Sequence, residues 1–206
     1  MVFLFIPNII GYIRYLFLFA SLFTYRTDPV LTLFCYGLSQ LLDMFDGMAA
    51  RKFKQSTNFG AVLDMVCDRA SDAVILAILA SLYPDYSWIF LSDIILDLTS
   101  HWFQMYSAIS SGEHHKKSKT NWKLLELYYS NKTVLFTLVA GNEIFFLTCY
   151  LNAFKDTLGL PEWLVQVNYI LLAVNFVLFL IKKLMSVIQL ISASEKIAEV
   201  DMKMRR

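Results

Sequence analysis

The sequence predicts an all-α integral membrane protein with six transmembrane helices. Of its 206 residues, 57% are hydrophobic and 16% are aromatic, whereas only 17% are charged. Soluble domains usually carry about 25% charged residues. In addition, apolar segments long enough to cross a bilayer, about 20 residues each, recur along the whole chain. The composition therefore indicates a membrane protein with several spanning helices.

Six apolar segments qualify as spans, and turn-forming or polar residues such as Pro84-Asp85 separate them. We expect a single membrane-embedded domain over residues 1–206, with a charged tail at 193–206. The sixth segment is long, and its end should leave the bilayer from Lys182 onward. The expected spans cover roughly residues 3–24, 28–48, 60–83, 87–110, 133–154 and 163–192.

The distribution of lysine and arginine predicts the orientation, because cytoplasmic loops are enriched in these residues. Basic residues gather in the loops at 51–59 and 111–132 and in the tail at 193–206. The loops on the opposite side carry only Arg26 and Lys155. Both termini and the loop at 51–59 are therefore expected on the cytoplasmic side of the membrane.

Several classes of function are not expected. The formal net charge is only +1, and there is no bulk basic surface of the kind that binds nucleic acid. Cys35, Cys67 and Cys149 are far apart and form no CxxC pair, which argues against a disulfide framework or a zinc site. His114 and His115 lie beside lysines without a third ligand, so a solvated loop is the simpler interpretation.

Aspartates are concentrated in and beside the second and third apolar segments. An ionised aspartate at mid-membrane costs about 2.5–3.5 kcal/mol, so such a cluster requires compensation. Asp43 and Asp46 share one helix face, and so do Asp64 and Asp68, because their spacings are three and four. Two antiparallel helices would bring the pairs together, and converging carboxylates need cations between them. Hard oxygen ligands of this kind suit Mg²⁺ or Mn²⁺.

The loop after the first aspartate pair adds groups suited to phosphate. Gly47 leaves backbone room beside Asp46, and Arg51 lies one turn further on, where a guanidinium could clamp a phosphate. Together with two metal ions, these groups describe a pyrophosphate site for in-line phosphoryl displacement. Intramembrane carboxylates also line ion pathways, so a divalent-cation transporter is an alternative. Such a transporter would need neither Gly47 nor Arg51.

The whole pattern from Asp43 to Asp68 reads D-x2-D-G-x2-A-R-x8-G-x3-D-x3-D. It resembles the signature of the CDP-alcohol phosphotransferases, which are six-helix membrane enzymes with a cytoplasmic active site. In that family the four aspartates hold two divalent metal ions, which bind the pyrophosphate of a CDP-linked substrate. The resemblance implies that two Mg²⁺ or Mn²⁺ ions are bound by Asp43, Asp46, Asp64 and Asp68.

The resemblance also implies roles for individual residues. Asp68, the last signature carboxylate, would be the base that activates the acceptor hydroxyl. Gly47 and Arg51 would contact the CDP moiety, and Asn8 and Thr57 lie where the family has further nucleotide contacts. The family usually forms homodimers, so a homodimer is expected here as well.

The sequence segments in and around the signature resemble one particular group of family members. "FLFIPNIIGYIR", "LLDMFDGMAAR", "FGAVLDMVCDR" and "LFTLVAGNE" are similar to eukaryotic members that use CDP-diacylglycerol and myo-inositol and release CMP. The similarity covers roughly residues 3–192 and implies a location in the endoplasmic reticulum membrane, with membrane lipid around the chain. A sister enzyme with another acceptor (glycerol phosphate, serine or an amino alcohol) is an alternative, as is a non-catalytic interaction protein.

The acceptor pocket is the least defined part of the prediction. Arg69, His101 and Lys132 are candidates because they lie near the matched motifs. His101 shares a helix face with Asp93 and Asp97, and this row could shape the pocket or form hydrogen bonds between helices. Asp72 lies outside the signature; it could support the site or pair with Arg69.

Overall fold

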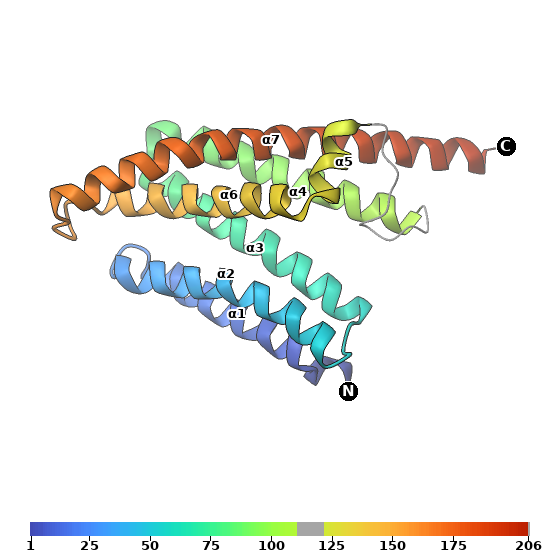
Figure 1. Cartoon of the computed structure of the whole chain (residues 1–206), viewed down its shortest axis with the longest axis horizontal. Coiled ribbons are helices and arrows are strands. Elements are labelled where there is room, and N and C mark those ends of the chain that lie inside the picture. Colours follow the sequence, from blue (N-terminus) through green and yellow to red (C-terminus); the bar gives the residue numbers. More distant parts are fainter. Residues whose placement is uncertain (111–121, 206) are drawn as a thin grey trace. The chain divides into compact units, whose positions relative to one another are not determined.

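The computed structural model describes residues 1–110 and 122–205, and these residues are helical with short connections (Figure 1). They contain seven α-helices and two short 3₁₀ helices. The chain divides into two compact units, Met1–Ser87 and Trp88–Arg206. His114, His115 and the lysines of their loop lie outside the described residues. The predicted all-α class is confirmed for the part of the chain that is described.

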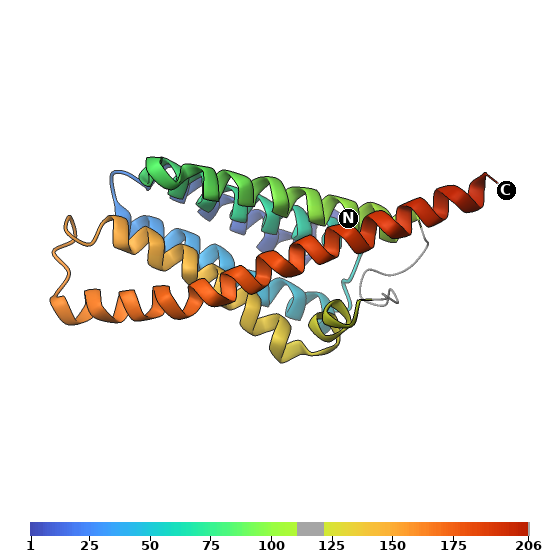
Figure 2. The ribbon, with the colours of Figure 1, turned by 90° about the horizontal axis from the view of Figure 1, so that it is seen from above.

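The first unit contains three long helices. Helices α1 and α2 lie side by side and antiparallel, and α3 returns from the end of α2 (Figures 1 and 2). One 3₁₀ helix precedes α1 and another follows α3. The bounds are η1 (Val2–Leu4), α1 (Ile6–Thr24), α2 (Pro29–Lys52), α3 (Asn58–Leu82) and η2 (Pro84–Tyr86).

Local capping residues set the starts of α2 and α3. The Asp28 side chain accepts a hydrogen bond from the Leu31 N–H at 3.0 Å, and Pro29 follows at the first helical position. The Thr57 hydroxyl accepts one from the Gly60 N–H, also at 3.0 Å. Such caps satisfy backbone N–H groups that have no partner within the helix. The polar residues between apolar segments therefore define where these helices begin.

The connection between α2 and α3 is fastened to the start of α1. Lys54 adopts a left-handed backbone conformation with φ of 54°, which turns the chain back on itself. The Gln55 side-chain oxygen then accepts a hydrogen bond from the Ile6 N–H at 2.9 Å. This contact places the beginning of the chain and the α2–α3 loop at the same end of the first unit.

Polar contacts also join α1 to α2. The hydroxyls of Thr24 and Thr32 lie 2.8 Å apart, and Ser39 donates a hydrogen bond to the Arg14 carbonyl at 3.1 Å. Small polar side chains of this kind hold helices together in an apolar environment. They fix the register of α1 on α2, which matters for the placement of Arg14.

The second unit contains four helices, and α6 runs antiparallel to α7 beside it (Figures 1 and 2). Asn131 caps α6 by accepting from the Thr133 N–H at 3.0 Å. A buried apolar cluster ties α5 to α6 and α7; its members are Leu125, Tyr128, Leu138, Met185 and Ile188. The bounds are α4 (Ser87–Ser110), α5 (Lys123–Ser130), α6 (Lys132–Ala153) and α7 (Glu162–Met204).

Two features of this unit differ from the simplest reading of the sequence. Helix α5 lies within the stretch at 111–132 that was expected to be a polar loop. Helix α7 continues without a break to Met204, so the charged segment after 193 extends the sixth apolar segment as helix. The single-domain boundary at 1–206 stays a prediction.

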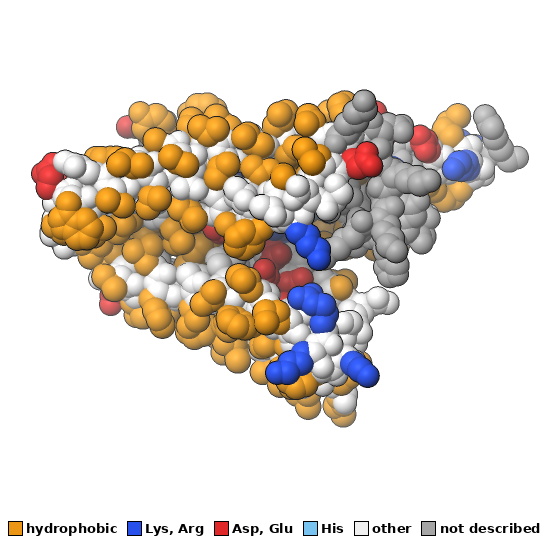
Figure 3. Space-filling view, viewed as in Figure 1, with side chains coloured by type: hydrophobic (Ala, Val, Ile, Leu, Met, Phe, Trp, Pro, Cys, Tyr) orange, Lys and Arg blue, Asp and Glu red, His pale blue; other side chains and the backbone are white. Residues whose placement is uncertain are grey.

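The protein is a multi-pass membrane protein. Three of the described helices, α1, α6 and α7, are long and apolar enough to cross a bilayer. Many large hydrophobic side chains are exposed on the helices of both units (Figure 3). Such surfaces are expected where lipid replaces water as the solvent. The six-span count stays a prediction, because α2, α3 and α4 carry more polar residues.

Candidate functional site

The two aspartate pairs converge within the first unit. Helix α2 supplies Asp43 and Asp46, and helix α3 supplies Asp64 and Asp68. One carboxylate oxygen from each of Asp43, Asp64 and Asp68 lies within 4.8 Å of the others. The convergence follows from the three- and four-residue spacings, which put each pair on one helix face. This arrangement is suited to a shared cation.

A buried arginine on α1 holds this cluster together. Arg14 Nη1 lies 2.7 Å from Asp43 Oδ1, 3.0 Å from Asp46 Oδ2 and 3.1 Å from Asp64 Oδ1. Its other terminal nitrogen, Nη2, lies 2.5 Å from Asp68 Oδ1. The four signature carboxylates thus share a single guanidinium, which gives all of them a charge-assisted partner.

The cluster has a buried side and an open side. The Arg14 side chain is fully buried, whereas 39% of the Asp43 side chain and 48% of the Asp64 side chain are exposed. Asp68 is intermediate at 32%, and Asp46 is nearly buried. A ligand can therefore reach the outer carboxylates while Arg14 supports them from within.

Arg14 was not assigned a role from the sequence. It lies in the first apolar segment, inside the quoted "FLFIPNIIGYIR", where a lone charge is expensive unless it has a partner. That cost was the one indication in the sequence that Arg14 must have an acidic partner. It did not identify the partners, because they come from two other helices and depend on how α1 packs.

The donor set fits a hard divalent cation. It consists of carboxylate oxygens from four aspartates, without a histidine or cysteine ligand at the cluster described here. Mg²⁺ and Mn²⁺ prefer such oxygen donors, whereas structural zinc sites use cysteine and histidine. The acidic cluster is thus consistent with a metal site, as the sequence predicted.

Arg51 folds back along α2 toward Gly47. Its Nη1 lies 3.5 Å from the position that a Cβ would take on Gly47. Arg51 is exposed, one turn after Asp46 and Gly47 on the same helix. A Cβ at Gly47 would be in ordinary van der Waals contact with the guanidinium of Arg51. Contact of both residues with a CDP group stays a prediction.

Asn8 and Thr57 make contacts within the protein. Asn8 is 1% exposed, and its side-chain nitrogen donates a hydrogen bond to the Val2 carbonyl at 2.7 Å. Its oxygen lies 2.9 Å from the position of a Cβ on Gly60, so α1 and α3 meet closely here. Thr57 caps α3. Their predicted contacts with the nucleotide are a proposal beyond these structural roles.

Asp72 pairs with Arg69, which was one of the two possibilities considered from the sequence. Arg69 Nη1 lies 2.9 Å from Asp72 Oδ2, and Nη2 lies 4.0 Å from Asp68 Oδ2. Arg69 therefore stands next to the last signature aspartate, where a pocket residue was expected. Its role toward an acceptor stays a prediction.

The other acceptor candidates belong to the second unit. His101 Nδ1 lies 2.8 Å from the Asp97 carbonyl oxygen and 3.3 Å from Asp97 Oδ1, so its contacts include the preceding turn of α4. Lys132 is exposed at the first position of α6. The acceptor roles of both residues stay predictions.

A second buried charge pair joins α4 to α7 in this unit. Lys183 Nζ lies 2.7 Å from Asp93 Oδ1, and only 3% of the Asp93 side chain is exposed. The same ammonium lies over the rings of Phe146 and Phe179, at 5.7 and 5.0 Å from their centroids. Aromatic faces stabilise a cation in such surroundings.

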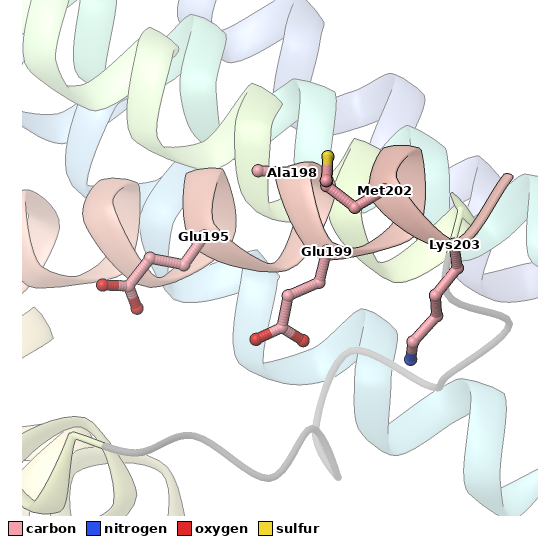
Figure 4. Close-up of a pocket in the computed structure, with 5 residues that line it drawn as sticks. All are labelled: Glu195, Ala198, Glu199, Met202 and Lys203. Atoms are coloured by element: carbon pink, nitrogen blue, oxygen red, sulfur yellow. The ribbon is translucent and has the colours of Figure 1, made fainter. Parts of the chain in front are cut away.

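A hollow also lies along the last turns of α7 (Figure 4). Its lining residues are Glu195, Ala198, Glu199, Met202 and Lys203. None of them belongs to the aspartate pattern, and the labelled side chains come from this one helix. We therefore place the candidate site at the carboxylate cluster and not at this hollow.

The fold and the site define a helical, multi-pass membrane protein with a carboxylate cluster suited to divalent cations. Residues 4–198 match the CDP-alcohol phosphatidyltransferase family, and the chain belongs to this family. The family membership predicted from the aspartate pattern is thus confirmed, and the matched region includes all four aspartates of the cluster.

Relatives from distant eukaryotes carry one and the same name, CDP-diacylglycerol–inositol 3-phosphatidyltransferase. The chain is 41% identical to the Homo sapiens protein, with 97% of this chain and 94% of the relative covered. It is 41% identical to the Candida albicans protein (97% and 84% covered) and 36% identical to that of Saccharomyces cerevisiae (97% and 88% covered). No solved structure matches the chain.

Proposed function

We propose that this chain is a phosphatidylinositol synthase, which transfers the phosphatidyl group from CDP-diacylglycerol to myo-inositol. The products are phosphatidylinositol and CMP. The observation that carries the proposal is the convergence of the signature carboxylates, with oxygens of three of them within 4.8 Å, in a chain whose full-length relatives share that activity's name.

Asp43, Asp46, Asp64 and Asp68 would hold two Mg²⁺ or Mn²⁺ ions. When bound, these ions supply positive charge to the pyrophosphate of the lipid substrate. The exposed guanidinium of Arg51, near Gly47, would bind a phosphate oxygen. The open side of the cluster would thus receive the CDP head, and the diacylglycerol chains would stay in the lipid.

In the reaction, a hydroxyl oxygen of inositol attacks the phosphorus that carries diacylglycerol. A new phosphorus–oxygen bond forms, the bond to CMP breaks, and CMP leaves with the bonding electron pair. Asp68 would accept the hydroxyl proton as general base. Its Oδ1 is fixed by Arg14 at 2.5 Å, which orients the carboxylate without closing its exposed side.

The base role can be tested by Asp68→Asn. This substitution keeps the shape of the side chain but removes its ability to accept a proton. We expect normal thermal stability within a few degrees and retained binding of CDP-diacylglycerol, with transfer abolished. Near-normal turnover of Asp68→Asn would refute the base role.

The acceptor is tested with purified protein in detergent, CDP-diacylglycerol, Mn²⁺ or Mg²⁺, and labelled acceptors. CMP release driven by inositol, together with an inositol-labelled lipid, supports the proposal. CMP release with glycerol phosphate, serine or an amino alcohol would keep the family mechanism but change the substrate. Metal flux across vesicles without any CMP release would favour a transporter, and neither activity would favour an interaction protein.

We further propose six membrane crossings, by α1, α2, α3, α4, α6 and α7, in the endoplasmic reticulum membrane with both termini cytoplasmic. The Ile6–Gln55 hydrogen bond supports part of this arrangement, because it puts the start of the chain and the α2–α3 loop on one side. Labelling of single cysteines at positions 54 and 156 in sealed microsomes tests it. Position 54 should react from the cytoplasmic side and position 156 only after permeabilisation.

A homodimer is also proposed, on the basis of the family resemblance. Its test is the mass of the purified protein in detergent, corrected for bound detergent, over a range of protein concentrations. A mass of one chain at all concentrations would contradict the dimer.

A further inference from the structure

The position of Arg14 relative to the carboxylates is unusual for a supporting residue. Its Nη1 alone lies within 3.1 Å of oxygens from three aspartates, which come from both α2 and α3. Nη2 reaches the fourth aspartate. The guanidinium is therefore at the centre of the cluster, where its charge acts on all four carboxylates at once.

A divalent cation at this site would need the same oxygens. Mg²⁺ binds carboxylate oxygens at about 2.0–2.1 Å and demands near-ideal octahedral geometry. A carboxylate oxygen that donates to such an ion has less electron density to offer Arg14, and two cations in close contact repel each other. Since arginine cannot lose its proton in a protein, it is a permanent cation at the cluster.

We propose that Arg14 is a positioning residue that gathers the four signature carboxylates and competes with divalent cations for their oxygens. It thereby keeps the cluster assembled when the metal concentration is low, and it weakens metal binding. The inference rests on the proposed function, because that function requires a metal at these aspartates.

A purely structural salt-bridge role predicts a different outcome. Removing one partner of a buried ion pair destabilises a protein, because the remaining charge loses its compensation. If Arg14 only supports the ligands, its loss lowers stability and metal affinity together. If it competes with the metal, its loss lowers the stability of the metal-free protein but tightens metal binding, because the net negative charge of the cluster increases.

The test compares wild type with Arg14→Gln and Arg14→Lys, each purified in detergent and freed of metal with chelator. Isothermal titration calorimetry with Mn²⁺ measures affinity, and thermal unfolding with and without Mn²⁺ measures stability. For Arg14→Gln we expect an unfolding temperature several degrees lower in chelator and Mn²⁺ binding about tenfold tighter. Arg14→Lys should change both quantities in the same directions but less.

Arg26→Gln is the matched control, since it removes the same charge at an exposed position of the same unit. It should alter neither quantity. Unchanged or weaker Mn²⁺ binding in Arg14→Gln would overturn the competition. If Arg14→Gln does not fold, weaker Mn²⁺ binding by Arg14→Lys would overturn it equally. Failure of wild type to bind Mn²⁺ at all would instead refute the metal site of the proposed function, and the inference with it.

Discussion

Lys183 on α7 lies 2.7 Å from Asp93 on α4, and their side chains are only 15% and 3% exposed, respectively. The rings of Phe146 and Phe179 flank the ammonium group. The pair therefore sits in apolar surroundings, where each charge depends on the other. The proposed reaction assigns no step to this pair, and its contribution should appear in stability.

We expect Lys183→Met to reduce the free energy of unfolding by about 3 kcal/mol, because it leaves Asp93 buried without its cation. The double variant Asp93→Asn/Lys183→Met should recover most of this loss. Thermal unfolding in detergent measures both. Lys203→Met, at an exposed position of the same helix, is the control. A Lys183→Met protein as stable as wild type would contradict the role of the pair.

The close approach of α6 and α7 at Gly141 should make any larger residue at this position destabilising. A Cβ at this position would lie 2.4 Å from Leu178 Cδ1 and 2.8 Å from Leu178 Cβ, so one of the helices must move. We expect Gly141→Ala to cost about 1–3 kcal/mol of stability. Gly37→Ala is the matched control, because nothing lies within 4 Å of its added methyl group. That control should be neutral or slightly stabilising; equal stability of both variants would argue against the close contact.

Removal of divalent cations should abolish CMP release. The clustered carboxylates repel one another and, in the proposed reaction, bind pyrophosphate only through cations. Excess chelator should therefore stop turnover, and added Mn²⁺ or Mg²⁺ should restore it. Asp64→Asn should reduce turnover by about two orders of magnitude or more, while Asp85→Asn, exposed in η2, should have no effect. Full activity in chelator would be incompatible with the metal site.

The hydrogen bond from the Ile6 N–H to the Gln55 side chain caps the start of α1, and its loss should lower the stability of the protein. Gln55→Leu removes the acceptor for the Ile6 N–H and should cost about 0.5–1.5 kcal/mol. Gln55→Glu keeps an oxygen at the same place and adds a negative charge at a helix N-terminus, so it should retain stability. Thermal unfolding distinguishes the two. If both variants lose stability equally, the side-chain oxygen at position 55 does not stabilise the protein by accepting this hydrogen bond.

The sequence was sufficient for the parts of the structure that depend on local periodicity. The expected segments lie within a few residues of α1, α2, α3, α4 and α6, whereas α7 continues to Met204, beyond the expected end at 192. The convergence of Asp43 with Asp64 and Asp68 followed from spacing along two helices joined by a short loop. Helix α5 was missed because its eight residues lie in a polar stretch, and its stability comes from packing against α6 and α7.

Partners across helices could not be predicted in the same way. Arg14 and Lys183 were visible as charges in apolar segments, but their partners lie 29 to 90 positions away in the sequence. Which carboxylate each one meets depends on helix register and rotation, which are fixed by contacts such as Ser39 with the Arg14 carbonyl. Asn8 shows the same limit, because its close approach to Gly60 depends on how α1 packs against α3.

The unbroken course of α7 has a geometric consequence. Its 43 residues rise about 65 Å, whereas a bilayer with its headgroups is about 40–45 Å thick. Even at the average tilt of about 20°, some 15–20 Å of the helix must stand in water beyond the headgroups. Because the helix is continuous, a displacement at Met204 would be transmitted along one rigid rod to Lys183. The C-terminal end of the chain is thus connected, through one continuous helix, to the ion pair between Lys183 and Asp93.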